Sequence, residues 1–152
     1  MDSKDRQILS ILQENATLPV HEMADRIGLS TTACWKRVQR LYHEGYIDKQ
    51  VCLLNRKKLG IGVTVFVAIR TNRHEPQWLE RFALALRDMP EIVEFYRMSG
   101  DVDYLLKVVA PDIEGYDQIY KRLIRAAELY DVSSSFSMEE LKYTTALPLD
   151  HA

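Results

Sequence analysis

The chain has 152 residues, of which 47% are hydrophobic and 28% are charged, a balance typical of a globular protein rather than a disordered or repetitive one. No apolar run approaches the roughly 18 residues that a membrane-spanning helix needs, and the polar start MDSKDR lacks the apolar core of a signal peptide, so we expect a cytoplasmic protein. The net charge of −2 conceals an asymmetry: residues 1–60 carry +3 and residues 61–152 carry −5, which predicts separate tasks for the two halves.

The first 48 residues carry three apolar patterns with helical spacing. They predict a helix over about residues 3–15, a short second helix that starts after Pro19 and ends at Gly28, and a third that Ser30 caps and Gly45 closes. Two helices joined by so tight a turn indicate a helix-turn-helix.

Residues 46–54 then become β-like, and a basic stretch leads to Gly60 and Gly62. We therefore expect a helix-turn-helix domain over residues 1–48 and a β linker or hinge over residues 49–62.

The remainder, residues 63–152, predicts an α/β domain. Its strands and helices are expected in the order βαββαβ, with strands at 63–70, 92–98, 103–109 and 132–138 and helices that start at Pro76 and after Asp112. This is the ferredoxin-like arrangement of four antiparallel strands with two helices on one face, so the fold class is α+β. Because nothing in the chain is left to cover the other sheet face, we expect a second copy there and hence a homodimer.

The third predicted helix has a face suited to DNA. A helical wheel with Cys34, Val38 and Leu41 inward places no acidic residue outward. Short polar side chains at the N-terminus of such a helix reach base edges, and cationic ones meet phosphates or guanine. The predicted DNA-binding residues are Ser30, Thr31, Thr32, Lys36, Arg37, Gln39 and Arg40.

Arg37 and Trp35 flank this face, and for each of them contact with DNA phosphate and packing against the first helix remain open. A basic face is also compatible with an ordinary solvated surface or with a non-specific, nucleoid-type DNA binder. An enzyme built on the ferredoxin-like half is a further alternative, but the four histidines are scattered without triad or ligand spacing. We therefore expect no enzymatic activity and no catalytic residue.

The two cysteines, Cys34 and Cys52, show neither CxxC spacing nor nearby paired histidines. We expect no disulfide, metal or cofactor, and we predict that both are buried packing residues.

Several stretches resemble the Lrp/AsnC family of feast/famine regulators over nearly the whole chain. They are DRQILSILQENA (5–16), MADRIGLSTTACWKRVQRLYHEGYI (23–47), LNRKKLG (54–60) and MSGDVDYLLKV (98–108). SSSFSMEELKYTTALPL (133–149) resembles more narrowly the family's cysteine-responsive branch. The resemblance implies a regulator whose winged helix-turn-helix over residues 1–48 binds an operator in double-stranded DNA. It also implies a C-terminal ligand-binding and oligomerisation domain, dimers that assemble into tetramers or octamers, and an amino-acid effector, with cysteine as a candidate.

The turn around Gly100 suits such an effector, because glycine lets the backbone approach a ligand and Asp101 and Asp103 can accept hydrogen bonds from an ammonium group. The same residue types are also favoured in plain hairpin turns. The family resemblance adds three neighbours where this loop is expected to face another dimer: Met98, Ser134 and Ser135.

Overall fold

The chain consists of two units joined by two chain segments. The structure, a computed structural model, describes residues 1–71, 75–127 and 131–151. One unit is formed by Met1–Leu53 together with Leu141–Ala152, and the other by Leu54–Glu140. We call them the helical unit and the α/β unit.

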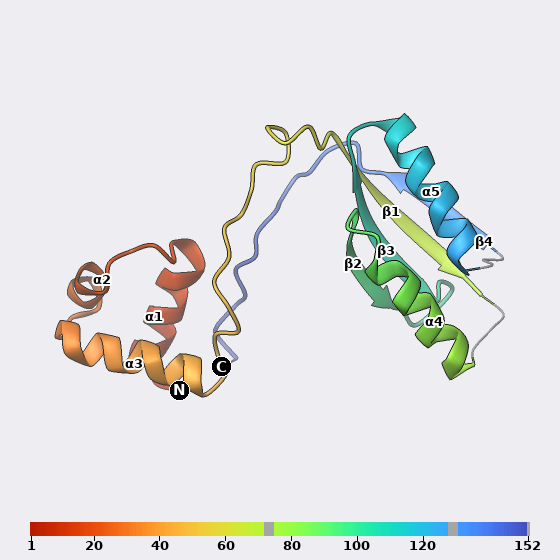
Figure 1. Cartoon of the computed structure of the whole chain (residues 1–152). Coiled ribbons are helices and arrows are strands. Elements are labelled where there is room, and N and C mark those ends of the chain that lie inside the picture. Colours follow the sequence, from red (N-terminus) through yellow and green to blue (C-terminus); the bar gives the residue numbers. More distant parts are fainter. Residues whose placement is uncertain (72–74, 128–130, 152) are drawn as a thin grey trace. The chain divides into compact units, whose positions relative to one another are not determined.

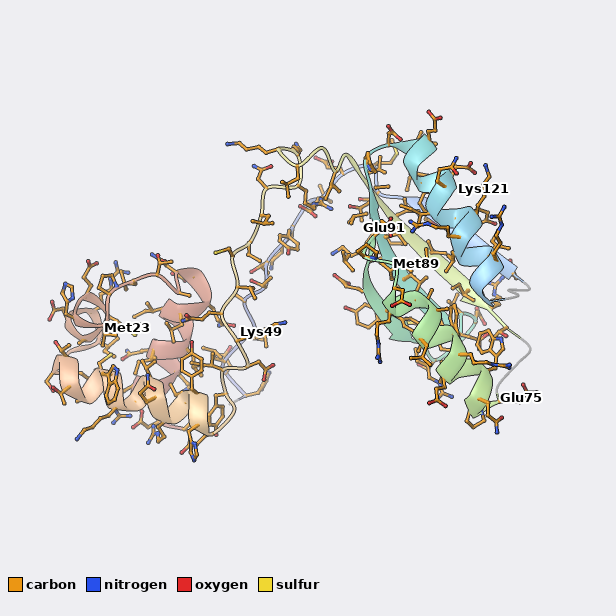
Figure 2. The ribbon with its side chains drawn as sticks, viewed as in Figure 1. Met23, Lys49, Glu75, Met89, Glu91 and Lys121 are labelled. Carbon is orange, nitrogen blue, oxygen red and sulfur yellow. The ribbon has the colours of Figure 1, made fainter. Side chains whose placement is uncertain are left out.

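The helical unit contains three helices, α1 (Ser3–Glu14), α2 (Val20–Ile27) and α3 (Thr31–His43). The predicted helices are therefore confirmed. Their apolar faces form one core in which Met23 is fully buried between the helices, as Figure 2 shows.

The turn between α2 and α3 follows directly from its residues. Gly28 ends α2 in the left-handed region, with φ of 65°, where glycine has no steric penalty. The Lys4 ammonium of α1 donates to the carbonyl of Ile27, which satisfies a carbonyl at the end of α2. The Ser30 side chain then accepts from the Ala33 N–H and starts α3. These capping interactions thus fix the turn between the two helices of the helix-turn-helix.

The α/β unit is a four-stranded antiparallel sheet in the order β2-β3-β1-β4. Its elements are β1 (Val63–Arg70), α4 (Pro76–Arg87), β2 (Ile92–Arg97), β3 (Tyr104–Ala110), α5 (Ile113–Ala127) and β4 (Asp131–Phe136). Both helices lie on one face of the sheet (Figure 1). The predicted ferredoxin-like order is confirmed.

Alternating side chains of the strands pack under the two helices. On β3, for example, every second residue from Tyr104 to Ala110 is buried. Aromatic rings fill one end of this core, where Trp78 stacks on Phe82 with ring centroids 5.0 Å apart. Phe66 and Tyr96 lie on the opposite face of the sheet and are largely exposed.

The predicted strand over residues 46–54 is wrong. Among the described residues no strand forms between α3 and β1, and Val51, Leu53 and Leu54 are exposed. A strand needs a neighbour for its N–H and C=O groups, and no described segment of the same chain pairs with this one. β4 also ends at Phe136 rather than at Met138, which is almost fully exposed.

Two further expectations differ from the structure. Cys34 is buried in the helical core as predicted, whereas Cys52 lies on the exposed segment after α3, so its prediction as a packing residue is wrong. Residues 141–151, which we expected in the α/β domain, pack instead in the helical unit.

This C-terminal segment is held against α1. The Leu147 N–H donates to Gln13 Oε1 at 2.6 Å, and Gln13 Nε2 donates back to the Leu147 carbonyl at 3.2 Å. Leu149 packs on the helical core. The helical unit is thus assembled from both ends of the described chain.

As far as the described residues extend, no helix has the length and apolarity required to cross a membrane.

Candidate nucleic-acid interface and ligand cavity

The outer face of α3 presents a polar and cationic surface. Thr31, Thr32, Lys36 and Gln39 are all exposed, and α3 contains no acidic residue. No hydrogen bond or ion pair to another described residue occupies the Lys36 ammonium. These four side chains are placed as the sequence predicts. Ser30 is exposed as well, and its hydroxyl accepts from the Ala33 N–H as the predicted cap of α3.

The two arginines of α3 are engaged by α1. Arg37 Nη1 donates to Asp5 Oδ1 at 2.8 Å and to Asp2 Oδ2 at 2.7 Å. Arg40 Nη2 donates to the same Asp5 oxygen at 2.6 Å. The wheel places Arg40 away from the core, yet its guanidinium reaches back to α1, with 46% of the side chain exposed. For Arg37 the structure favours the packing alternative over a free phosphate contact.

Asp5 is the buried centre of this network, because only 2% of its side chain is exposed. Burial alone would raise the pKa of its carboxyl group. Hydrogen bonds from the Asp2 N–H and the Arg37 guanidinium, together with the charge of Arg40, outweigh burial and hold the Asp5 pKa below its ordinary value. The hydrogen bond from Arg37 lowers the pKa of Asp2 to about 2, and both carboxylates raise the pKa of Arg37.

A partly enclosed cavity of about 300 Å³ lies in the α/β unit where β2 ends and β3 and α4 begin. Its lining combines one cation, one carboxylate and a mostly apolar wall: Pro76, Leu79, Arg97, Met98, Asp103 and Tyr104. Asp103 Oδ2 accepts the Thr71 N–H at 2.8 Å, and within the described chain no donor reaches Oδ1. Opposite charges above an apolar wall can hold a small zwitterion.

Two of the predicted effector residues, Met98 and Asp103, line this cavity. Gly100 and Asp101 lie in the same loop but outside the lining. Gly100 has φ of 111°, so it serves the turn, and the Asp101 carbonyl accepts from Arg70 Nε at 2.8 Å.

Ser134 and Ser135 are not brought to the cavity. They lie on β4, which is separated from β2 by β3 and β1. They also face opposite sides of the sheet: Ser134 pairs with buried Val67 and contacts the Tyr116 hydroxyl at 2.5 Å, whereas Ser135 pairs with exposed Phe66. Within one chain they therefore cannot join Met98 and Asp103.

Sequence reasoning missed the rest of the lining. Arg97 falls in the strand predicted over residues 92–98, and Leu79 falls in the helix predicted to start at Pro76, so neither was considered as a contact for the effector. An arginine at the end of an edge strand, next to a loop with two aspartates, was the available signal.

A larger groove of about 530 Å³ lies between α1 and residues 146–150. It is open to solvent and would surround a small molecule less completely than the cavity does. Among the described residues, no group of three or more His, Cys, Asp or Glu side chains is arranged to hold a metal ion.

Two family models match the chain. Residues 1–42 match the AsnC-type helix-turn-helix domain, and residues 64–147 match the Lrp/AsnC ligand binding domain.

The sequence is also similar to characterised regulators along its whole length. It is 46% identical to the glutamate uptake regulatory protein of Zymomonas mobilis over 149 residues, which cover 98% of this chain and 91% of that protein. It is 44% identical to the DNA-binding transcriptional activator DecR of Escherichia coli K12, with 99% of both chains covered.

Solved structures of transcriptional regulators are similar to this chain as well. An AsnC family transcriptional regulator from Agrobacterium tumefaciens shares 56% sequence identity with a TM-score of 0.96, covering 99% of each chain. The transcriptional regulator NMB0573 of Neisseria meningitidis, solved in complex with L-Met, shares 30% identity with a TM-score of 0.94, covering 99% of this chain and 98% of that one. These relatives are named as regulators and not as enzymes, in line with the sequence prediction. The chain belongs to the Lrp/AsnC family of DNA-binding transcription regulators.

Proposed function

We propose that the chain regulates transcription by reading an operator with the exposed face of α3, and that a small amino acid bound in the cavity of the α/β unit controls it. The cavity carries the effector proposal, because it places an arginine and an aspartate around a mostly apolar wall. Since its partner is the DNA of the cell, we also propose that the protein acts in the cytoplasm.

The DNA-reading part of the proposal rests on the outer surface of α3. Thr31, Thr32 and Lys36 project from its first half, the part that enters the major groove in helix-turn-helix proteins, and Gln39 follows on the same face. Lys36 supplies a positive charge without a competing partner among the described side chains. Arg37 and Arg40 hold α3 against α1, so their contribution to DNA binding is partly indirect.

The effector class follows from the lining of the cavity. Arg97 can donate to a carboxylate and Asp103 Oδ1 can accept from an ammonium group, so both termini of a free amino acid have a partner. Pro76, Leu79 and Met98 leave an apolar wall for the side chain. We therefore propose an effector with a small apolar or sulfur-containing side chain. Cysteine fits this description, and so does the methionine bound by the Neisseria relative.

We propose homo-oligomers that assemble through the sheet face opposite the helices. On that face Phe66 lies between Lys107 of β3 and Ser135 of β4, and Tyr96 lies beside Leu105. Phe66 is 40% exposed, and contact of so much aromatic surface with water in the middle of a sheet is unfavourable in free energy. Two such faces against each other would remove these side chains from water.

The DNA proposal is tested by substituting Lys36 with alanine. DNA binding should weaken by about 1 to 3 kcal/mol, because one phosphate or base contact is lost, and the salt dependence should flatten if the contact is to phosphate. Mobility shifts with a duplex that the wild-type protein selects from a random-sequence pool give the affinity. Arg81→Ala, which removes an exposed charge of α4, is the control. Equal affinity of Lys36→Ala and the control would contradict the assigned face, and equal affinity for all duplexes would indicate a non-specific binder.

A further inference from the structure

Trp35 is the exception among the large apolar side chains of helices α1, α2 and α3. The structure describes every residue of α1, α2 and α3, and each leucine, isoleucine, valine, methionine and tyrosine on these helices is buried or partly buried. The Trp35 side chain is instead 52% exposed. The other tryptophan of the chain, Trp78, is 5% exposed and stacks on Phe82. Trp35 is thus not needed to complete the helical core.

The position of Trp35 on α3 is specific. Thr31, Trp35 and Gln39 follow one another at a spacing of four residues, so they form one stripe along the helix, next to Lys36. The arginines Arg37 and Arg40 lie on the other flank of α3, where Asp5 holds them. The exposed indole therefore belongs to the surface that we propose reads DNA, and not to the contact between α3 and α1.

The chemistry of this surface indicates which partner covers the indole. A second copy of the same surface would bring two Lys36 ammonium groups together without an acidic residue on α3 to separate them. Duplex DNA presents phosphates to Lys36 and also presents apolar patches, namely thymine methyl groups in the major groove and the deoxyribose rings at its wall. A flat apolar ring with one N–H donor matches such a surface.

We infer that the Trp35 indole contacts the apolar surface of the DNA groove and contributes directly to operator affinity. This inference rests on the proposed DNA-reading function of α3. It adds a residue that makes no charge contact, so its contribution to affinity does not depend on counterion release.

The test compares Trp35→Ala and Trp35→Phe with wild type. The probe is the duplex that wild-type protein selects from a random-sequence pool, and binding is measured by fluorescence anisotropy of the labelled duplex. We expect Trp35→Ala to bind about tenfold more weakly with an unchanged slope of affinity against salt, and Trp35→Phe to retain most of the affinity. Tyr46→Ala, which removes another exposed aromatic ring of the helical unit, is the control and should bind like wild type.

A second measurement does not depend on the alanine variant. Acrylamide should quench the exposed Trp35 of wild type much more than buried Trp78, and bound DNA should protect Trp35 from quenching. The same titration with Trp35→Phe, which retains only Trp78, should show no such protection. Replacing the thymines of the duplex with deoxyuridine then separates the two apolar surfaces, because only a thymine-methyl contact weakens on this DNA.

Two results together would overturn the inference while leaving the proposed function intact. Trp35→Ala would bind DNA as tightly as wild type does, and bound DNA would not protect Trp35 of wild type from acrylamide quenching. Loss of oligomers in Trp35→Ala, measured by sedimentation without DNA, would also overturn it, because the indole would then contact protein. Absence of any DNA binding by wild type would overturn both.

Discussion

The carboxylate of Asp5 links two helices of the DNA-binding unit. It accepts hydrogen bonds from two arginines of α3 and from the N–H of Asp2, and it is almost completely buried. Because Asp2 and Asp5 also cap α1 reciprocally, one carboxylate fixes both the start of α1 and the flank of α3. The orientation of the proposed DNA-reading surface therefore depends on a buried residue that lies outside this surface.

Replacing Asp5 with asparagine should destabilise the helical unit. The amide keeps the size of the side chain and an oxygen for the cap, but it leaves the arginines without their charge partner. We expect a loss of about 2 kcal/mol in the free energy of unfolding, below the cost of a fully buried pair because both arginines remain partly exposed. Urea unfolding followed by circular dichroism measures it. Asp25→Asn, on the exposed side of α2, should change it little.

The same comparison has a pH signature. The pKa of Asp5 is lowered in the folded state and that of Asp2 lies at about 2, so their stabilisation is complete above the unfolded-state pKa of about 3.9 and is lost as the pH falls through the folded-state values. Wild type should therefore lose stability between about pH 4 and pH 2. Asp5→Asn should show a shallower loss, and identical pH profiles would refute the role of Asp5.

The substitution Asp103→Asn tests the proposed effector cavity, because it replaces one carboxylate oxygen of the lining with an amide nitrogen. Asp103→Asn retains an acceptor for the Thr71 N–H, so the fold should persist, but it removes the negative charge that an ammonium group needs. We expect at least about tenfold weaker binding of the effector in calorimetric titrations, with DNA binding of the free protein unchanged.

Asp101→Asn should weaken effector binding less, since Asp101 lies outside the lining. Glu114→Gln, which changes an exposed carboxylate of α5, should not weaken it. Wild-type affinity in Asp103→Asn would place the effector site elsewhere.

For single residues, the sequence predicted those roles that depend only on neighbouring positions in the same helix. The cap of Ser30 and the exposure of Lys36 follow from periodicity within one helix. The ion pairs of Arg37 and Arg40 do not, because their partner lies more than 30 residues away on α1. The sequence contained both charges but no information on their distance.

Among the elements, the C-terminal segment packs on the core formed by the three helices. Its attachment to α1 depends on the side-chain amide of Gln13, which contacts both polar groups of the Leu147 backbone, and on the packing of Leu149. Such a contact between an amide side chain and a peptide group leaves no pattern in the sequence of either partner.

Gln13→Ala should therefore release this segment without unfolding the helices. Two hydrogen bonds of about 1 kcal/mol or less each are lost, so amide hydrogen exchange at Leu147 should accelerate about tenfold while exchange in α2 stays unchanged. Gln7→Ala, which removes an amide of the same helix without a described hydrogen bond, is the matched control. If Leu147 exchanges at the same rate in both variants, the attachment does not depend on Gln13.

The elements were predictable to different degrees for a physical reason. The three helices of the helical unit and the two helices and four strands of the ferredoxin-like order follow from periodicity and caps, which act within a few residues. Residues 46–54 have the composition of a strand, but a strand also requires a partner, and no described segment supplies one. The composition of residues 46–54 thus indicated that they could form a strand, but within the described chain they have no strand to pair with.

At the scale of the whole molecule, the uncovered sheet face predicts assembly. Phe66→Asp should dissociate oligomers, because it places a charge in the middle of the face that we propose is buried between copies. Sedimentation velocity over a concentration series of the full chain measures the shift toward monomer.

Leu84→Asp, which changes an equally apolar and exposed side chain on α4, should leave the oligomer unchanged. A monomeric wild type, or unchanged assembly in Phe66→Asp, would exclude this face.

The arrangement of the two units along the chain also has a consequence for biosynthesis. Residues 141–151 belong to the helical unit but are translated after the entire α/β unit. At about 5 to 20 residues per second, the ribosome needs roughly 4 to 17 seconds to make residues 54–140. During that interval the three helices have been synthesised but Leu147 and Leu149 do not yet exist. The DNA-binding unit is therefore completed last although its helices are translated first, and a nascent chain stalled within the α/β unit would carry helices that lack their final contacts.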